Sequence, residues 1–102
     1  MEVEEFVMNT KFKDMELDFL FEMILSLKNK EECYAFFDDL CTVQELKALS
    51  QRLEVAKMLY DHKVYSDIVA KTGASTATIS RVNRSLSYGS EGYKIVFERL
   101  KK

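Results

Sequence analysis

Proline is absent from this chain of 102 residues, and glycine occurs only three times. Because these residues interrupt helices most strongly, and because β-branched residues do not alternate in period-two runs, the composition predicts helices throughout. No apolar run approaches the roughly 18 residues of a membrane span, and no signal peptide is recognisable, so we expect a cytoplasmic protein without a membrane partner. At this length we expect a single domain, with no room for a separate catalytic domain.

Reactive side chains are also few: the chain has two cysteines, Cys33 and Cys41, and one histidine, His62. A structural zinc site normally needs four ligands in closely spaced pairs, so we expect no metal. In the cytoplasm both cysteines should be reduced, and we expect them to be buried. His62 falls in a predicted link between helices, and no Gly-rich phosphate loop is present. We therefore predict no enzyme and no cofactor; a small enzyme that uses His62 or Cys41 is the weakest alternative.

Acidic residues are missing from the whole stretch 72–90. Exposed helices usually mix Glu with Lys, so this absence is informative. The charge bias extends along the chain: residues 1–45 hold twelve acids and four lysines, a net charge of -8, whereas residues 46–102 hold eleven bases and five acids, a net charge of +6. Such segregation predicts a protein that turns one basic face toward a polyanion.

Residues 65–86, YSDIVAKTGASTATISRVNRSL, have the pattern of a helix-turn-helix. Gly73 stands where the first helix must stop, and we expect a positive φ there. Ser75 follows two residues later and can cap the second helix. The apolar residues predicted to point inward are Ile68, Val69, Ile79, Val82 and Leu86. This pattern predicts a second helix that is free to enter the major groove of DNA.

The outward residues of this motif are small, hydroxylated or cationic. Ser and Thr can hydrogen-bond base edges or phosphates, and arginine can bind phosphate or guanine through two N–H groups. The predicted DNA contacts are Ser75, Thr76, Ala77, Ser80, Arg81 and Arg84. Lys57 and Lys71 are weaker candidates for phosphate contacts. The alternative is a helical hairpin with an ordinary solvated face.

The rest of the chain reads as a helical frame around the motif. Residues 1–13 are predicted to form an arm, and Asp14 to cap a first helix that reaches about Leu27. A second helix should cover about residues 30–40, and the capping box at residues 42–45 (TVQE) should open a third that ends near residue 60. Residues 14–62 thus form the predicted dimerisation and bracing helices. A last helix is expected over residues 91–101.

The first two helices carry more apolar and aromatic side chains than one stripe can hold. A domain this small would leave several of these rings in water, whereas a second subunit could cover them. We therefore predict a homodimer built from the N-terminal helices. The alternative is that these aromatic residues fill the core of a monomer.

The order LCTVQELKALSQRLEVAKML, a short linker and TGASTATISRVNRSL resembles the Trp repressor superfamily, and more closely its YerC/YecD group of Trp-repressor-like proteins. The resemblance covers about residues 40–86. It implies an all-α, intertwined homodimer whose paired helix-turn-helix units bind double-stranded DNA at a palindromic operator. The implied function is that of a sequence-specific transcription regulator, and we expect a repressor. The alternative is a helical protein-interaction module that binds a partner through its acidic N-terminal face and does not bind DNA.

The resemblance also suggests an effector pocket. The Trp repressor holds its tryptophan corepressor with two arginines and neighbouring threonines, which Arg52, Arg81, Thr42 and Thr78 match here. Guanidinium groups can clamp a carboxylate and stack on a ring. The residue after the second arginine is glycine in the Trp repressor but Val82 here, and its side chain should fill the space of the indole. We therefore expect no tryptophan corepressor, whereas another small-molecule effector stays open.

Overall fold

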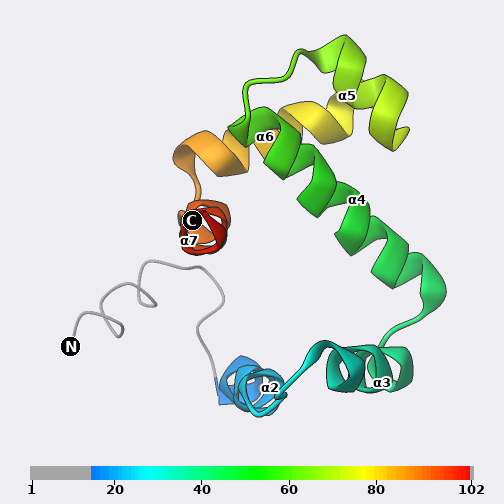
Figure 1. The fold of residues 1–102 in the computed structure, drawn as a ribbon, viewed down its shortest axis with the longest axis vertical. Helices are drawn as coiled ribbons and strands as arrows, with labels where there is room; N and C mark the ends of the chain where they lie inside the picture. The colour runs from blue at the N-terminus through cyan, green and yellow to red at the C-terminus, as the bar shows by residue number, and fades with distance from the viewer. Residues whose placement is uncertain (1–14, 102) are drawn as a thin grey trace. The chain divides into compact units, whose positions relative to one another are not determined.

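The computed structural model describes residues 15–101 of the chain, so the predicted arm at residues 1–13 and its cap Asp14 lie outside the described residues. Within this range the chain is entirely helical (Figure 1). The helices are α2 (Met15–Leu25), α3 (Lys30–Leu40), α4 (Val43–Tyr60), α5 (Tyr65–Thr72), α6 (Thr76–Tyr88) and α7 (Gly92–Leu100). The prediction of an all-α protein is confirmed. The chain divides into two compact units, Met1–Val43 and Gln44–Lys102.

Helices α2 and α3 form the described part of the first unit. Helix α2 ends at Leu25 rather than near Leu27, because the Ser26 hydroxyl donates to the Met23 carbonyl at 2.6 Å and tightens the last turn. Helix α3 has the predicted bounds. Its start is fixed by Asn29, whose side chain accepts from the Glu32 N–H at 2.8 Å, while the Glu32 carboxylate accepts from the Lys28 N–H at 2.9 Å. This reciprocal pairing satisfies two N–H groups at the helix start.

Neither α2 nor α3 buries a single side chain. Phe19 is 63% exposed and Tyr34 is 75% exposed, and Met15, Phe21 and Leu25 are exposed as well. Cys33 and Cys41 are free thiols, as predicted, but each is half-buried rather than buried. The first unit therefore presents large apolar side chains on its surface.

The second unit has a small apolar core, to which α4, α5, α6 and α7 all contribute (Figure 1). Its buried residues are Val55, Ala56, Ile68, Ala74, Ile79, Val82 and Phe97. Burying one such aliphatic side chain stabilises a fold by about 1.5–3 kcal/mol, so these residues fix how the helices pack. Within residues 15–101, no helix has both the length and the apolar character needed to cross a membrane.

The prediction of which residues of the motif point inward is partly correct. Ile68, Ile79 and Val82 are buried, and Leu86 is half-buried. Val69 was expected inside but is 38% exposed, because α5 packs through Ile68 alone. In the long helix α4, the spacing of three and four residues predicts an inward stripe of Leu46, Leu49, Leu53, Ala56 and Leu59 or Tyr60. Of this stripe only Ala56 is buried, together with Val55 from outside it, and Leu49 and Leu53 are exposed.

Helix α4 ends in a turn that sends the chain into α5. The His62 N–H donates to the Leu59 carbonyl and the Lys63 N–H to the Met58 carbonyl, both at 2.9 Å. His62 has a φ of 64°. This pair of bonds with a left-handed residue is the Schellman motif, in which glycine is the usual occupant. His62 therefore ends a helix, as the sequence predicts for its position.

Helix α7 packs on the end of α4. The Tyr60 hydroxyl donates to the Glu98 carboxylate, and the Tyr60 and Phe97 rings lie 5.2 Å apart between centroids. The hydrogen bond from Tyr60 is the main cause that lowers the pKa of Glu98, and Lys101 nearby lowers it further. The sequence predicts a flexible link over residues 87–92 before the last helix, but α6 continues to Tyr88 and α7 begins at Gly92. Helix α6 ends where the Gly89 N–H donates to the Ser85 carbonyl at 2.8 Å.

Candidate nucleic-acid interface

The turn between α5 and α6 has the predicted geometry at Gly73. Gly73 adopts φ 73° and ψ 5°, and its N–H donates to the Val69 carbonyl at 2.9 Å. This left-handed conformation costs glycine nothing but strains a residue with a β-carbon. Helix α5 therefore ends at Thr72, and the chain can reverse within three residues before α6 begins at Thr76.

Side chains hold this turn as well as the backbone does. The Thr72 hydroxyl donates to the Ile68 carbonyl at 2.8 Å and accepts from the Ala74 N–H at 3.1 Å. From α4, the Gln51 amide nitrogen donates to the Thr72 carbonyl at 3.2 Å. Ala74 itself is buried. The turn is thus hydrogen-bonded both to α5 and to the long helix α4.

Ser75 caps α6, as its position in the sequence predicts. Its side-chain oxygen accepts from the Thr78 N–H, and its hydroxyl donates to the Thr78 hydroxyl oxygen, both at 3.1 Å. The first turn of α6 contains no acidic side chain. The helix start therefore keeps the positive end of its dipole open to an anion. Because the Ser75 hydroxyl is occupied within the helix, its main part in the structure is to fix where α6 begins.

The predicted outward face of α6 is exposed. Thr76, Ser80 and Arg84 follow one another at spacings of four residues, and Ala77 and Arg81 lie beside them; all five are exposed. Ile79 and Val82 on the opposite side are buried. Among residues 15–101, neither Arg81 nor Arg84 has an ion-pair partner. Both guanidinium groups are therefore free to bind an anionic ligand.

The two lysine candidates differ in their surroundings. Lys57 Nζ lies 2.7 Å from the Asp61 carboxylate and 6.0 Å from the centroids of the Tyr60 and Phe97 rings. Its charge is thus already paired next to α7, which makes it a weaker phosphate ligand than the sequence suggests. Lys71 is exposed in the last turn of α5 and makes no such pair within the described part of the chain.

The residues of the suggested effector pocket are distributed over both units. In the second unit Arg52 and Arg81 are exposed, Thr78 is half-buried, and Val82 is only 2% exposed within the apolar core. Thr42 belongs to the first unit. The Val82 side chain thus points into the core of the second unit. Within residues 15–101, no three His, Cys, Asp or Glu side chains gather as a metal site would require.

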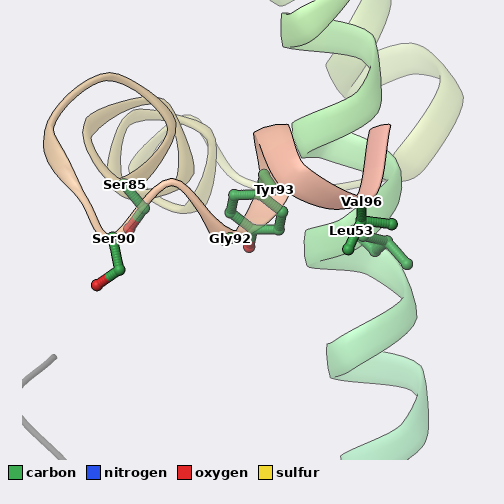
Figure 2. Close-up of a pocket in the computed structure, with 6 residues that line it drawn as sticks. All are labelled: Leu53, Ser85, Ser90, Gly92, Tyr93 and Val96. Carbon is green, nitrogen blue, oxygen red and sulfur yellow. The ribbon is translucent and has the colours of Figure 1, made fainter. Parts of the chain in front are cut away.

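An open hollow of about 380 Å³ lies in the second unit. Figure 2 shows Leu53 and Val96 side by side at one end of it and Ser85 and Ser90 at the other, with Gly92 and Tyr93 between them. Leu53 comes from α4, Ser85 from α6 and Val96 from α7. The hollow adds an apolar surface to the exposed side of α4.

Gln51 and Thr72, which hold the turn, are not among the functional residues that the sequence predicts. Gln51 stands four residues before Val55 and so shares its side of α4, but the sequence does not show that this side is the buried one. A polar residue on an inward stripe needs a hydrogen-bond partner. That partner, the Thr72 carbonyl, is 21 residues away and could not be named from the sequence.

The model of the Trp repressor protein family matches residues 15–101. The chain belongs to the Trp repressor family. It is 57% identical over 91 residues to the protein YerC of Bacillus subtilis (strain 168), a match that covers 89% of this chain and 88% of YerC. This agrees with the YerC/YecD group that the sequence motifs indicate.

Two solved structures share the fold. The crystal structure of a TrpR-like protein from Eubacterium eligens ATCC 27750 is 62% identical, with a TM-score of 0.85 over 88% of this chain and 93% of that chain. The second is the crystal structure of a Staphylococcus aureus protein described as a putative Trp repressor. Its sequence is 50% identical, with a TM-score of 0.83 over 98% of this chain and 94% of that chain. The family and these structures establish a Trp-repressor-like, all-helical fold of the DNA-binding regulator type.

Proposed function

We propose that this protein is a sequence-specific DNA-binding transcription regulator that acts in the cytoplasm as a homodimer on a palindromic operator, as a repressor. Each subunit inserts α6 into the major groove, so that two copies of α6 enter successive grooves roughly 34 Å apart. Thr76, Ala77 and Ser80 face the base edges, and Arg84 and Arg81 bind bases or phosphates. Lys71 supplies a further phosphate contact.

The observation that carries this proposal is the outward face of α6. It combines a fixed start at Ser75, small polar side chains over the first two turns, and two unpaired arginines. Small side chains let the helix backbone approach the bases, while guanidinium groups supply the charge that phosphates require. The absence of acidic residues from 72–90 removes the repulsion that a phosphate backbone would otherwise meet.

The homodimer is supported by apolar surface in both units. Helices α2 and α3 bury no side chain although they carry Phe19, Phe21 and Tyr34 on their surface. The second unit exposes Leu53 and Val96 at its open hollow. Apolar surface stabilises a complex by about 25 cal/mol per Å² when it leaves water, so a second copy of the chain would gain by covering these side chains. Light scattering at micromolar concentration tests this part: a stable monomer would contradict it.

We also propose that α6 reaches its DNA-binding position without tryptophan. Val82 belongs to the core that α6 shares with α4, α5 and α7. Its side chain takes the place that the resemblance assigns to an indole, so Arg52 and Arg81 have no ring to hold beside it. Isothermal titration with tryptophan should therefore show no micromolar binding, and clear binding would contradict this statement.

Selection of bound duplexes from a random oligonucleotide pool tests the function and yields the operator. The dimer carries two copies of Arg84, and a base or phosphate contact of arginine contributes about 1–3 kcal/mol, so Arg84→Ala should raise the Kd for that operator by about thirtyfold or more. Arg99→Ala is the matched control: it removes the same charge from α7, and it should change the Kd much less.

Salt dependence separates the kinds of contact that Arg84 makes. If each Arg84 of the dimer binds a phosphate, the slope of log K against log salt should fall by about two units in Arg84→Ala, whereas base contacts leave the slope almost unchanged. Wild-type protein that enriches no sequence from the pool, at low as well as physiological salt, would refute the proposed function.

A further inference from the structure

Gln51 joins the bracing helix α4 to the turn of the DNA-binding motif. Its amide nitrogen donates to the Thr72 carbonyl at 3.2 Å, in a half-buried position. Thr72 is the last residue of α5, and the last four carbonyls of a helix have no partner within the helix. Gln51 therefore satisfies a carbonyl that would otherwise lack a protein donor at the point where the chain turns toward α6.

The other bonds of the turn are local. Gly73 bonds back to Val69, and the Thr72 hydroxyl bridges the Ile68 carbonyl and the Ala74 N–H. These bonds fix the shape of the turn but do not connect it to α4. Apolar packing through Val55 and Ala56 does connect them, yet it is non-directional, so it tolerates sliding that a hydrogen bond resists.

We propose that Gln51 is a positioning residue for DNA recognition: through the Thr72 carbonyl it sets the direction in which the turn delivers α6. This inference rests on the proposed function. A binding constellation has to be held within about 0.5 Å and 10–20° of its productive geometry. Gln51 acts on DNA only through the turn, since the residues that face the duplex are on α6.

Gln51→Met tests the proposal, because methionine keeps the length and approximate shape of the side chain and removes the donor. Gln44→Met is the matched control: it makes the same change near the start of the same helix, at an exposed glutamine. The chain has only three glycines, which makes the Gly73 amide easy to follow by NMR. Its hydrogen exchange reports on the turn in the free protein, with no DNA present.

Gln51→Met should speed exchange of the Gly73 amide by roughly tenfold, as expected when a half-buried carbonyl loses its partner. Without the bond, the closed turn can also adopt other directions, and the apparent Kd rises by the inverse of the fraction that keeps the competent one. If about one-tenth of the molecules keep it, the Kd for the selected operator should rise roughly tenfold. The Kd for an unrelated duplex, which depends on charge alone, should not change. Gln44→Met should leave all three quantities at their wild-type values.

Two results would overturn the proposal. Wild-type exchange at Gly73 in Gln51→Met would show that the bond does not hold the turn. Faster exchange together with an unchanged operator Kd in fully folded protein would show a role in stability alone. Failure of the proposed function looks different, because the wild-type protein would then select no operator while the Gly73 exchange of Gln51→Met could still be measured.

Discussion

Replacement of Gly73 by alanine isolates the backbone conformation of the turn. Nothing lies within 4 Å of a β-carbon built at Gly73, so the substitution meets no steric obstacle. The cost comes from φ +73°, where an L-residue pays roughly 1–2 kcal/mol. Alanine also lowers the conformational entropy of the unfolded chain, which stabilises the folded protein by about 0.4–1 kcal/mol. Gly73→Ala should therefore lower the free energy of unfolding by about 1 kcal/mol.

The other two glycines provide internal controls with opposite expectations. Gly92 opens α7 with free space around its β-position, so Gly92→Ala should raise the free energy of unfolding by about 0.4–1 kcal/mol. A β-carbon at Gly89 would lie 2.4 Å from the Ser85 carbonyl oxygen. This atom is backbone and cannot rotate away, so Gly89→Ala should cost roughly 1–3 kcal/mol, as overpacking generally does.

Urea unfolding at one fixed protomer concentration measures this series, since the midpoint of an oligomer depends on concentration. The predicted order of stability is Gly92→Ala, wild type, Gly73→Ala and then Gly89→Ala. Gly73→Asn should lie between Gly73→Ala and wild type, because asparagine tolerates the left-handed region better than alanine. Stability of Gly73→Ala equal to or above that of wild type would refute the reasoning, since the turn would then not require a positive φ.

Four further substitutions, at three positions, test the ends of the helices. Ser75→Ala should cost about 1 kcal/mol in urea unfolding, because the Thr78 N–H loses its acceptor; an unchanged midpoint would contradict the cap. His62→Gly should raise the free energy of unfolding by up to about 1 kcal/mol, because it removes strain at φ 64° at some cost in entropy, whereas His62→Val should lower it. Tyr60→Phe removes the hydrogen bond that lowers the pKa of Glu98. A carboxyl with a folded pKa below its unfolded value stabilises the fold above the unfolded pKa, and this contribution is lost as the pH falls through the folded pKa. Thermal melts of Tyr60→Phe should therefore lose less stability than wild type between neutral pH and the acid side of the ordinary Glu range, and parallel profiles would contradict the assignment.

The motif could be predicted in detail because its signals are local. Gly73 ends one helix and Ser75 starts the next through bonds that span four residues or fewer. Each of these signals acts through the residue's own backbone preference or its own side chain. No knowledge of the tertiary packing is needed, so the turn and the outward face of α6 follow from the sequence.

The packing of α4 could not be predicted in the same way. The helix has apolar residues on more than one side, and Leu49 and Leu53 looked as suitable for burial as Ala56. Which side is covered depends on where α5, α6 and α7 pack, and they cover Val55 and Ala56. Val69 was misplaced for the same reason, because Ile68 beside it takes the only buried position of α5.

Burial of Val82 in the core of the second unit bears on how the protein would be regulated. Its burial fixes one side of α6 against residues of its own unit, and burying such a side chain contributes about 1.5–3 kcal/mol. A helix that is packed in this way needs no ligand to complete its packing. Under the proposed function, occupancy of the operator would then follow the concentration of assembled dimer rather than that of a corepressor. Two half-sites bound by one dimer make this dependence steep, because a single subunit gains only the affinity of one half-site.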